Sequence, residues 1–382
     1  RNLYWVNGGG FYDESLHWSL SSGGSGGECP PLPIDNVYFD SNSGFGPNQN
    51  VVVRDLDAFC NSMIWNMVPN NPNFTTANDI WRLNIFGILK FDPNMEFDFP
   101  GRVYFRASGT STIKSNGQSF KYNVYFQSKS GDWTFEDHFR TYGTTYPINL
   151  IVNGGTIRSN FDITLHGSWL GIEDSARLFL GPSIVRMIPT SSYNLNSIFN
   201  YAPHNFHSGT SEFIIEDGVT SGSIFVKGSI EFYNMTFKNH ESALYEGSVR
   251  NKLVFESHGL YSTSGDYITF INDLEFKSSG GLSQQYFNSN KANYHKIKFA
   301  PGQSYNIRGQ HNIIPHGGIE GEIFLQGLPN QYIELMGDNA YIIKDDLNGV
   351  GTCTKYVFLS NMHHTGTEDI YVPTPGGDVI NN

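Results

Sequence analysis

Short apolar segments recur along this chain at a nearly constant spacing, and that spacing limits the folds the chain can adopt. Val103–Phe105 returns as Val124–Phe126, 21 residues later. A second series, with steps of 22 residues, consists of Ile113, Phe135, Ile157 and Phe179. Turn-forming Ser, Asn, Asp and Gly residues lie between neighbouring members. A repeat of this length, with short strands and polar corners, is typical of a β-solenoid.

We therefore predict an all-β protein, a right-handed parallel β-helix with an N-terminal capping segment. Each coil stacks on the previous one at about 4.8 Å, and this stacking supplies the stability because no coil buries its inward face alone. Aromatic residues are 15%, charged residues are only 16%, and there are 41 Gly, a composition that suits short strands joined by turns. A β-sandwich is the competing fold, but a sandwich requires no regular period.

Residues 1–65 are predicted to form the capping segment, because glycine runs and Pro30–Pro33 separate brief aromatic strands there. Residues 66–382 are predicted to form the coils. Insertions leave a solenoid as loops on one side, which is often the binding side. We expect such loops near residues 188–210, 238–250 and 279–294.

Charge and cysteine content narrow the classes of function. The chain has 36 acidic and 24 basic residues, a net charge of −12, and no basic stripe that would suit a nucleic acid. No run of about 20 apolar residues is present, so we expect no membrane insertion. Cys29, Cys60 and Cys353 are too few for a disulfide scaffold. A disulfide between Cys29 and Cys60 remains open, and Cys60 otherwise fits as buried filler in an apolar strand.

Three polar residues form the candidate metal site. Asp35, Asn36 and Asp40 lie close together in a loop-and-strand segment, and their oxygen atoms are the ligands that calcium prefers. Hydrogen bonds within Asx turns explain the same residue types. Calcium is the one cofactor that the sequence suggests.

No catalytic motif emerges from the other polar residues. His363–His364 favours a solvated corner, because adjacent strand residues point to opposite faces. Three histidines precede a glycine and are predicted turn residues, namely His166, His258 and His316. The densest acid pairs lack an acidic mate one coil away for glycoside hydrolysis; they are Glu136–Asp137, Glu173–Asp174 and Asp345–Asp346. Trp133 and Trp169 are predicted core residues rather than sugar-stacking platforms.

Several segments are characteristic in combination: Tyr4–Val6 with His17–Ser19, Asp35–Ser43, Ala58–Trp65 and Thr352–Leu359. Together they resemble large secreted cell-surface proteins of the Bacteroidota, some of which are gliding-motility adhesins. The likeness covers most of the chain and is densest over residues 4–65. It implies a piece of a longer β-helical protein, exported by the type IX secretion machinery and displayed at the cell surface. At Phe11–Tyr12 this chain departs from the Asn-Trp that the family often has.

A short segment adds a modification site to this expectation. Asp174–Ala176 is similar to the acceptor pattern of O-glycosylation in these bacteria, so Ser175 is a candidate glycosylation site.

The resulting hypothesis is a non-catalytic adhesin segment that presents loops for attachment to glycans or abiotic surfaces. The loops near 188–210 and 279–294, rich in Tyr, Asn and Ser, are the expected contact surfaces. One alternative is a polysaccharide lyase or glycoside hydrolase on the same scaffold, because a fold does not fix a function. A groove lined by charged residues and exposed aromatics would favour that enzyme. The third hypothesis is a structural spacer that binds no ligand.

Overall fold

The computed structural model of the chain is all-β, with 56% of its residues in strands and 1% in helix, and it forms a parallel β-solenoid. This confirms the predicted fold class. The structure describes residues 1–54, 57–143, 148–167, 169–171, 175–188, 197–200, 205–216, 223–238, 242–263, 269–284, 292–344 and 357–364. None of the helices within these ranges has the length and apolar character needed to cross a bilayer.

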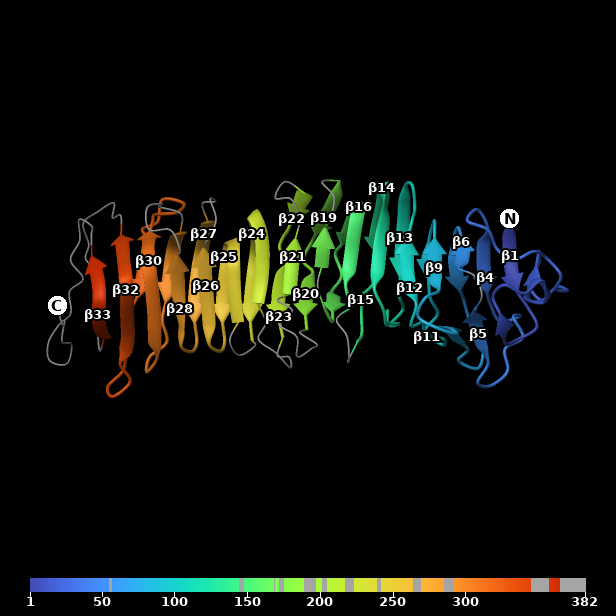
Figure 1. Cartoon of the computed structure of the whole chain (residues 1–382), viewed down its shortest axis with the longest axis horizontal. Helices are drawn as coiled ribbons and strands as arrows, with labels where there is room; N and C mark the ends of the chain where they lie inside the picture. The colour runs from blue at the N-terminus through green and yellow to red at the C-terminus, as the bar shows by residue number, and fades with distance from the viewer. Residues whose placement is uncertain are drawn as a thin grey trace. The chain divides into compact units, whose positions relative to one another are not determined.

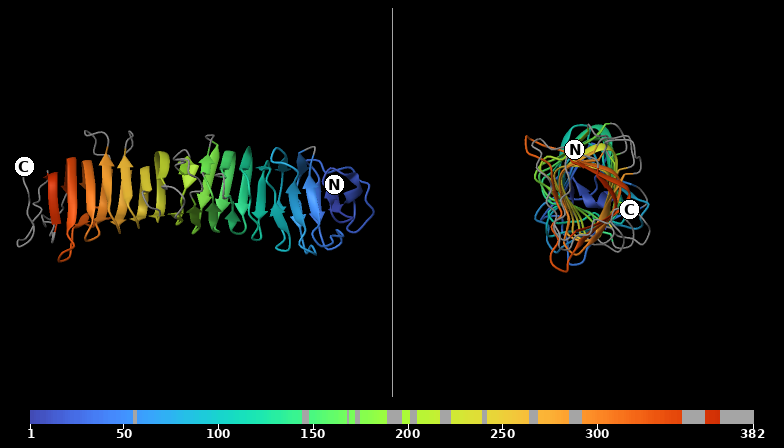
Figure 2. Two further views of the ribbon diagram at one scale, coloured as in Figure 1. Left: turned by 60° about the horizontal axis from the view of Figure 1, so that its bottom comes forward. Right: turned by 90° about the vertical axis from the view of Figure 1, so that its left-hand side faces the viewer.

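The chain divides into two compact units, Arg1–Ser191 and Ser192–Asn382. Within each unit, the strands of successive coils lie side by side (Figures 1 and 2). Each unit is described by itself below.

Three parallel ladders build the N-terminal unit, with strands of one coil paired to the equivalent strands of the next. Ladder 1 contains β1 (Asn2–Trp5), β4 (Asn36–Phe39), β7 (Met63–Trp65), β10 (Leu89–Lys90), β13 (Thr110–Lys114) and β19 (Ala176–Leu180). Ladder 2 contains β2 (Gly10–Phe11), β5 (Asn50–Val53), β8 (Asn73–Thr76) and β11 (Glu96–Asp98). Ladder 3 contains β6 (Ala58–Cys60), β9 (Arg82–Ile85), β12 (Arg102–Phe105) and β18 (Trp169–Gly171).

Two long strands turn a corner of the coil. β14 (Val124–Phe135) and β16 (Leu150–Ser159) pair within ladder 3 through their first residues and within ladder 1 through their last residues. A further parallel run consists of β15 (Phe139–Arg140), β17 (Ile163–Leu165) and β20 (Ile184–Met187).

The strand register tests the two repeat series directly. Val103–Phe105 pairs residue for residue with Val124–Phe126, so the first series is confirmed. In the second series, Ile113 pairs with Phe135 as predicted. The continuation is wrong, because Ile157 pairs with Trp133, and Phe179 pairs with Arg158. The coils after Phe135 differ in length, so a constant step of 22 residues leaves the register.

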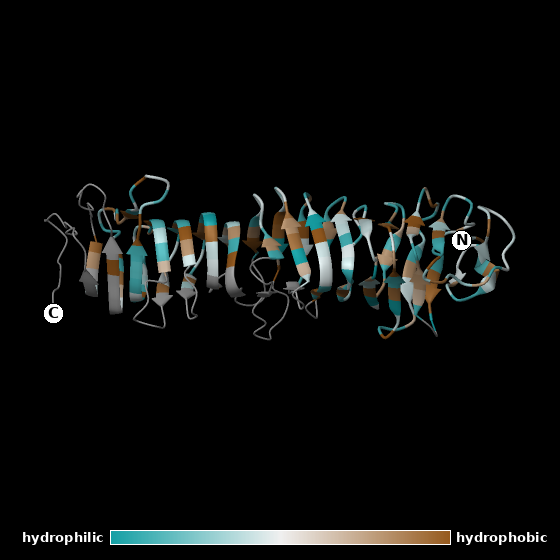
Figure 3. Ribbon diagram, turned by 90° about the horizontal axis from the view of Figure 1, so that it is seen from above, coloured by the Kyte–Doolittle hydropathy of each residue, from teal (hydrophilic) through white to brown (hydrophobic). Residues whose placement is uncertain are grey.

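Aromatic rings fill the interior and stack from coil to coil. Phe39 and Trp65 of ladder 1 stack with their ring centroids 3.9 Å apart, and Phe74 of ladder 2 meets Trp65 edge-on at 6.1 Å. Phe105 and Phe126 of ladder 3 stack at 4.9 Å. Successive side chains of a strand point to opposite faces, and this alternation appears as bands of hydrophobic and hydrophilic residues in Figure 3. Each ring pair adds about 0.5–1.5 kcal/mol beyond the burial itself.

The N-terminal edge of ladder 1 is covered by a short excursion of the chain. The 3-10 helix η1 (Ser15–His17) leads into β3 (Trp18–Ser19), which pairs antiparallel with β1. Trp5 and Trp18 are fully buried and meet edge-on at 5.1 Å. A covered edge leaves no row of unpaired backbone groups for another strand. Parallel stacking already includes β1, so the coils begin within the segment 1–65 that the sequence assigns to the cap.

The C-terminal unit repeats the stacking with longer strands. They are β21 (Ser197–Asn200), β22 (Phe206–His207), β23 (Glu212–Ile215), β24 (Ser223–Phe237), β25 (Ser242–Phe255), β26 (Gly259–Thr263), β27 (Thr269–Phe276), β28 (Gly280–Gln284), β29 (Ala292–Lys298), β30 (Ser304–Ile313), β31 (Glu322–Phe324), β32 (Ile333–Lys344) and β33 (Val357–His364). Its interior also contains a ring stack, in which Phe237, Phe255 and Phe276 follow one another at 5.0 and 5.3 Å.

The structure differs from the three predicted loop insertions. The stretch near 238–250 is mostly strand, because β25 begins at Ser242 and pairs with β24. Arg250 is exposed in this strand and donates a hydrogen bond to Glu231. Within 279–294, residues 280–284 and 292–294 are strand, and 285–291 lie outside the described residues. Within 188–210, residues 197–200 and 206–207 are strand, and 189–196 and 201–204 lie outside the described residues.

Opposite charges face each other across neighbouring coils of this unit. Glu275 accepts hydrogen bonds from Lys252 at 2.7 Å and Lys298 at 2.9 Å. The hydrogen bond from Lys252 is the main reason that the pKa of Glu275 is lowered. Lys296 pairs with Glu322 at 2.9 Å in the same way. Such cross-strand pairs contribute about 0.2–1 kcal/mol each, so they reinforce the register that the core sets.

Removal of one ring from the stack tests the dependence on the interior. Phe126→Ala is expected to lower the free energy of unfolding by about 3–5 kcal/mol, because the neighbouring coils cannot close the cavity. The measurement is urea denaturation followed by circular dichroism. Gln127→Ala, at the next and exposed position of β14, is the control and should change stability by at most about 0.5 kcal/mol. Equal losses for the two variants would contradict the stacking argument.

Candidate functional site: an aromatic groove beside β6 and β9

An open groove of about 960 Å³ lies beside β6 and β9 in the N-terminal unit. Four stretches line it: Tyr12–Asp13, Cys29–Leu32, Asp57 with Phe59, and Ile80–Arg82. Leu32 is 54% and Ile80 is 63% exposed, so apolar surface is open to solvent here. We call this site the aromatic groove. Its size is in the range of ligand pockets, which combine apolar surface with a few polar groups.

Side chains along the strands of ladder 3 alternate between the inner and the outer face, and two of the lining residues point outward. Ala58 and Cys60 of β6 point inward and pair with Leu83 and Ile85 of β9. Phe59, between them, is therefore on the outer face, as is Arg82 at the start of β9. Tyr12 holds the cap against this face, because its hydroxyl donates a 2.9 Å hydrogen bond to the carbonyl oxygen of Phe59.

An ion pair between the exposed Arg1 and the buried Asp35 holds the proline-containing part of the lining. Asp35 is completely buried and accepts hydrogen bonds from Arg1 Nε at 3.0 Å and Arg1 Nη2 at 2.8 Å. Its Oδ2 also accepts the backbone N–H of Leu32 at 2.9 Å. The hydrogen bond with Arg1 is the main cause that lowers the pKa of Asp35 to about 2. Asp35 thus fixes Leu32 and, through it, the adjoining prolines.

The charged residues of the groove are compensated within the protein. Asp57 Oδ1 accepts the backbone N–H of Arg82 at 3.0 Å, and its Oδ2 lies 4.0 Å from Arg82 Nε. Asp13 Oδ1 lies 3.8 Å from Arg54 Nε. Each acid therefore faces an arginine. The surface left for a ligand is mainly aromatic, aliphatic and proline.

The thiols near the groove are not paired. Cys29 is an exposed free cysteine of the lining, and Cys60 is a buried free cysteine beneath it, so the open question of a Cys29–Cys60 disulfide is answered by two free thiols. Burial raises the pKa of the Cys60 thiol, which keeps it protonated and unreactive. Cys353 lies outside the described residues.

The three candidate calcium ligands do not converge. Asp35 and Asn36 lie at the start of β4, whereas Asp40 follows its end. Asn36 joins an amide row across coils, bonded to Asn2 at 3.1 Å and Asn61 at 2.8 Å. Asp40 Oδ1 accepts the backbone N–H of Asn42 at 2.9 Å and closes an Asx turn. In the described part of the chain, no group of three or more His, Cys, Asp or Glu residues is arranged to hold a metal ion.

The remaining sequence candidates lie in structural positions where they are described. The hydroxyl of Ser175 is buried close to Gly154, so the described conformation does not present it for glycosylation. Asp137 accepts hydrogen bonds from the backbone and hydroxyl of Ser115. Trp133 is fully buried in the core, as predicted. The acid pairs Glu173–Asp174 and Asp345–Asp346 and the side chains of Trp169 and His363–His364 lie outside the described residues.

The histidine–glycine pairs serve as corners or strand starts. His166 contacts the carbonyl oxygen of Thr141, and Gly167 follows with φ +154°. Gly317 has φ +60°, the left-handed region that favours glycine. Gly259 differs, because it begins β26.

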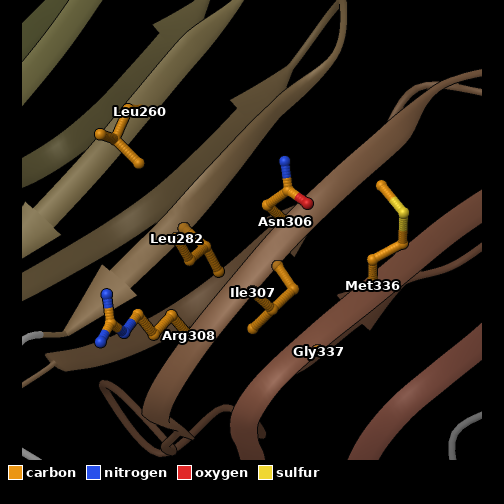
Figure 4. A pocket seen from close by; sticks show the side chains of 7 residues that line it. All are labelled: Leu260, Leu282, Asn306, Ile307, Arg308, Met336 and Gly337. Atoms are coloured by element: carbon orange, nitrogen blue, oxygen red, sulfur yellow. The ribbon is translucent and has the colours of Figure 1, made fainter.

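The C-terminal unit has a smaller hollow of about 340 Å³ on β26, β28, β30 and β32. Figure 4 shows Leu260 of β26, Asn306 of β30 and Met336 of β32 around it. They occupy one row of the register with Gly281, whose missing side chain deepens the row. The hollow is mainly aliphatic and lacks the aromatic rings of the groove.

Comparison with known proteins assigns neither a family nor a function to this chain. No protein-family model, curated protein or solved structure matches this chain. Its function is therefore inferred from its own residues.

The Asp35–Arg1 pair predicts a pH-dependent stability. The folded pKa of Asp35, about 2, lies below its ordinary value of 3.8. Its stabilisation of about 2 kcal/mol is therefore present above pH 4 and is lost as the pH falls toward 2. Asp35→Asn should be less stable by about that amount at pH 7, and the difference should shrink below pH 4.

Urea denaturation of both proteins at a series of pH values measures this effect. Asp40→Asn, which alters an exposed turn four residues after β4 begins, is the control and should cost less. A loss for Asp35→Asn that is the same at pH 3 and pH 7 would refute the role of the buried charge.

Proposed function

We propose that this chain is a non-catalytic segment of a secreted surface adhesin and that the aromatic groove binds a glycan. The observation that carries the proposal is an open groove lined by Phe59, Trp81 and prolines, whose acids are compensated by arginines. Aromatic side chains offer large, rigid apolar faces with a polar edge. The apolar faces of sugar rings suit such a lining, and their hydroxyl groups remain near water.

The resemblance to Bacteroidota surface proteins supports the cellular context of this proposal. Export by the type IX secretion machinery would place the solenoid outside the cell, where glycans and abiotic surfaces are the available contacts. Many weak contacts become strong attachment when several copies act together. A single shallow groove is therefore sufficient for an adhesin.

The enzyme alternative has a specific observation in its favour, since acids, an arginine and the half-buried aromatic residues Phe59 and Trp81 meet in one groove. Glycoside hydrolysis requires two carboxyl groups that act on the substrate, one as an acid and one as a base or nucleophile. Here Asp57 is hydrogen-bonded to Arg82, and Asp13 faces Arg54. This engagement favours binding over turnover.

Loss of the Trp81 ring should weaken glycan binding by roughly tenfold or more, as for a central aromatic contact. The full chain and Trp81→Ala are compared on a glycan array and then by calorimetry with the strongest hit. Tyr142→Ala is the matched control, because Tyr142 is an aromatic residue that is 51% exposed and does not line the groove. Equal binding by wild type and Trp81→Ala would place the glycan elsewhere, for example on the stretches 188–210 and 279–294 that the sequence suggested.

The exposed Cys29 gives an independent measure of where the ligand lies. In a Cys353→Ser background, the bound glycan should slow maleimide labelling of Cys29, because this thiol is part of the lining. Unchanged labelling at saturating glycan would contradict binding in the groove. Appearance of shortened glycan products during the incubation would favour the enzyme, and absence of binding to every glycan would favour the spacer.

A further inference from the structure

A cluster of arginine and tyrosine side chains continues the outer face of ladder 3 beyond the groove. Arg102, Tyr104 and Arg106 alternate along β12 and its next residue, so they share the outer face. In the register, Arg82 of β9 is the partner of Arg102, and Tyr125 of β14 is the partner of Tyr104. We call these five residues the Arg–Tyr cluster.

The rings and guanidinium groups of the cluster are in contact. Tyr104 and Tyr125 stack with centroids 4.6 Å apart and an interplanar angle of 9°. The Cζ atoms of Arg106 and Arg82 lie 5.0 and 5.6 Å from the centroid of the Tyr104 ring. Cation–π contacts at these distances hold an arginine in place without neutralising it. The tyrosines therefore orient positive charge on this face.

Two of these arginines have no acidic partner. Elsewhere in the N-terminal unit, arginines bond to carboxylates, as Arg1 does with Asp35 and Arg158 with Asp132. Among the described residues, no carboxylate lies within ion-pair distance of Arg102 or Arg106. The Nε atoms of both are buried and have no hydrogen-bond partner. Arg102 is hydrogen-bonded to the side chain of Tyr104, which is not an acid. Because the side chains of Arg102 and Arg106 are only half-buried, an anion can accept hydrogen bonds from the outer part of the guanidinium groups and neutralise the cluster.

The cluster lies on the same rows of the sheet as the groove. Arg82 belongs to both sites: it donates its backbone N–H to Asp57, which immediately precedes β6, and it is the register partner of Arg102. Phe59 begins the neighbouring row, which reaches Tyr104 and Tyr125. Because adjacent strands are about 4.8 Å apart, a chain that leaves the groove across β9 meets Arg102 after one further strand.

We propose that the Arg–Tyr cluster binds an anionic group, a carboxylate or a sulfate, of the glycan that occupies the aromatic groove. The inference rests on the proposed function and specifies its ligand as an acidic polysaccharide. Guanidinium groups present paired N–H donors that match the oxygen pairs of carboxylate and sulfate. A nucleic acid fits less well, since its affinity depends on many phosphate contacts and the chain as a whole has a net charge of −12.

Matched pairs of polymers test the charge requirement. The full chain is titrated with galacturonan oligomers and with their methyl-esterified form, and likewise with dextran sulfate and dextran. We expect binding of at least one acidic member to exceed that of its neutral partner roughly tenfold or more, and to weaken as salt is raised. The two pairs distinguish a carboxylate from a sulfate.

A double variant locates the effect. Arg102→Gln/Arg106→Gln should lose roughly tenfold or more of the affinity for the acidic polymer and most of its salt dependence. Lys90→Gln/Lys114→Gln is the control, because it removes the same charge from paired positions of ladder 1. Circular dichroism and urea denaturation establish that both variants are folded. Equal affinities of the two double variants would overturn the proposal.

The outcomes separate this inference from the proposed function. Glycan binding that depends on Trp81 but is equal for neutral and acidic polymers refutes the anion site and leaves the adhesin proposal standing. Failure of every glycan to bind refutes both. Stronger binding of single-stranded oligo-dT than of any acidic glycan, lost in Arg102→Gln/Arg106→Gln, would also overturn the inference, because the cluster would then serve a nucleic acid.

Discussion

Each coil of this chain has an inward face that only the neighbouring coils can cover, and the rest of the structure depends on that mutual burial. The rings of Phe39, Trp65 and Phe74 show how it is achieved, since each contacts a ring from another strand. Parallel pairing brings equivalent residues of successive coils together. The core is therefore continuous along each unit. The contacts of a residue depend on its row in a ladder as much as on its neighbours in the sequence.

The same arrangement leaves an outer face on which rows of side chains run across the strands. In the C-terminal unit one row alternates basic and acidic residues, namely Lys252, Asp273, Lys296 and Glu322. Glu275 of a neighbouring row pairs with both Lys252 and Lys298, so these charges satisfy one another. In the N-terminal unit one row of the outer face runs from Phe59 to Tyr125 and includes aromatic residues. Beside this row, Arg102 and Arg106 form no ion pair with an acidic residue among the described residues, and their Nε atoms have no hydrogen-bond partner. The inward side chains of the described coils are buried, so the rows of the outer face and the residues beside them are the surfaces open to solvent.

The residues between β1 and β4 have two structural roles. Trp18 and β3 cover the edge of ladder 1, which protects the stack from further strand addition. The segment from Cys29 to Leu32 lines the groove and is held by the buried carboxylate of Asp35. Asp35, a candidate metal ligand by its residue type, therefore acts through an arginine and a backbone N–H. A segment rich in Asp and Asn has the same composition whether it binds a metal ion or forms hydrogen bonds within the protein. Here the position of Arg1, bonded to Asp35, distinguishes the two roles.

The all-β class, the solenoid and the inward position of Trp133 could be predicted from the sequence, because a periodic pattern of apolar residues carries the burial information locally. The pairing of Val103–Phe105 with Val124–Phe126 could be predicted for the same reason. The register after Phe135, where coil length changes, and the strand character of Ser242–Phe255 emerge only in the folded chain. The same is true of the groove and of the Arg–Tyr cluster. Arg102 and Arg106 share a face through the alternation of one strand. Trp81 and Arg82 belong to the previous coil, and only the stacking of the coils, which no local spacing records, places Arg82 beside Arg102.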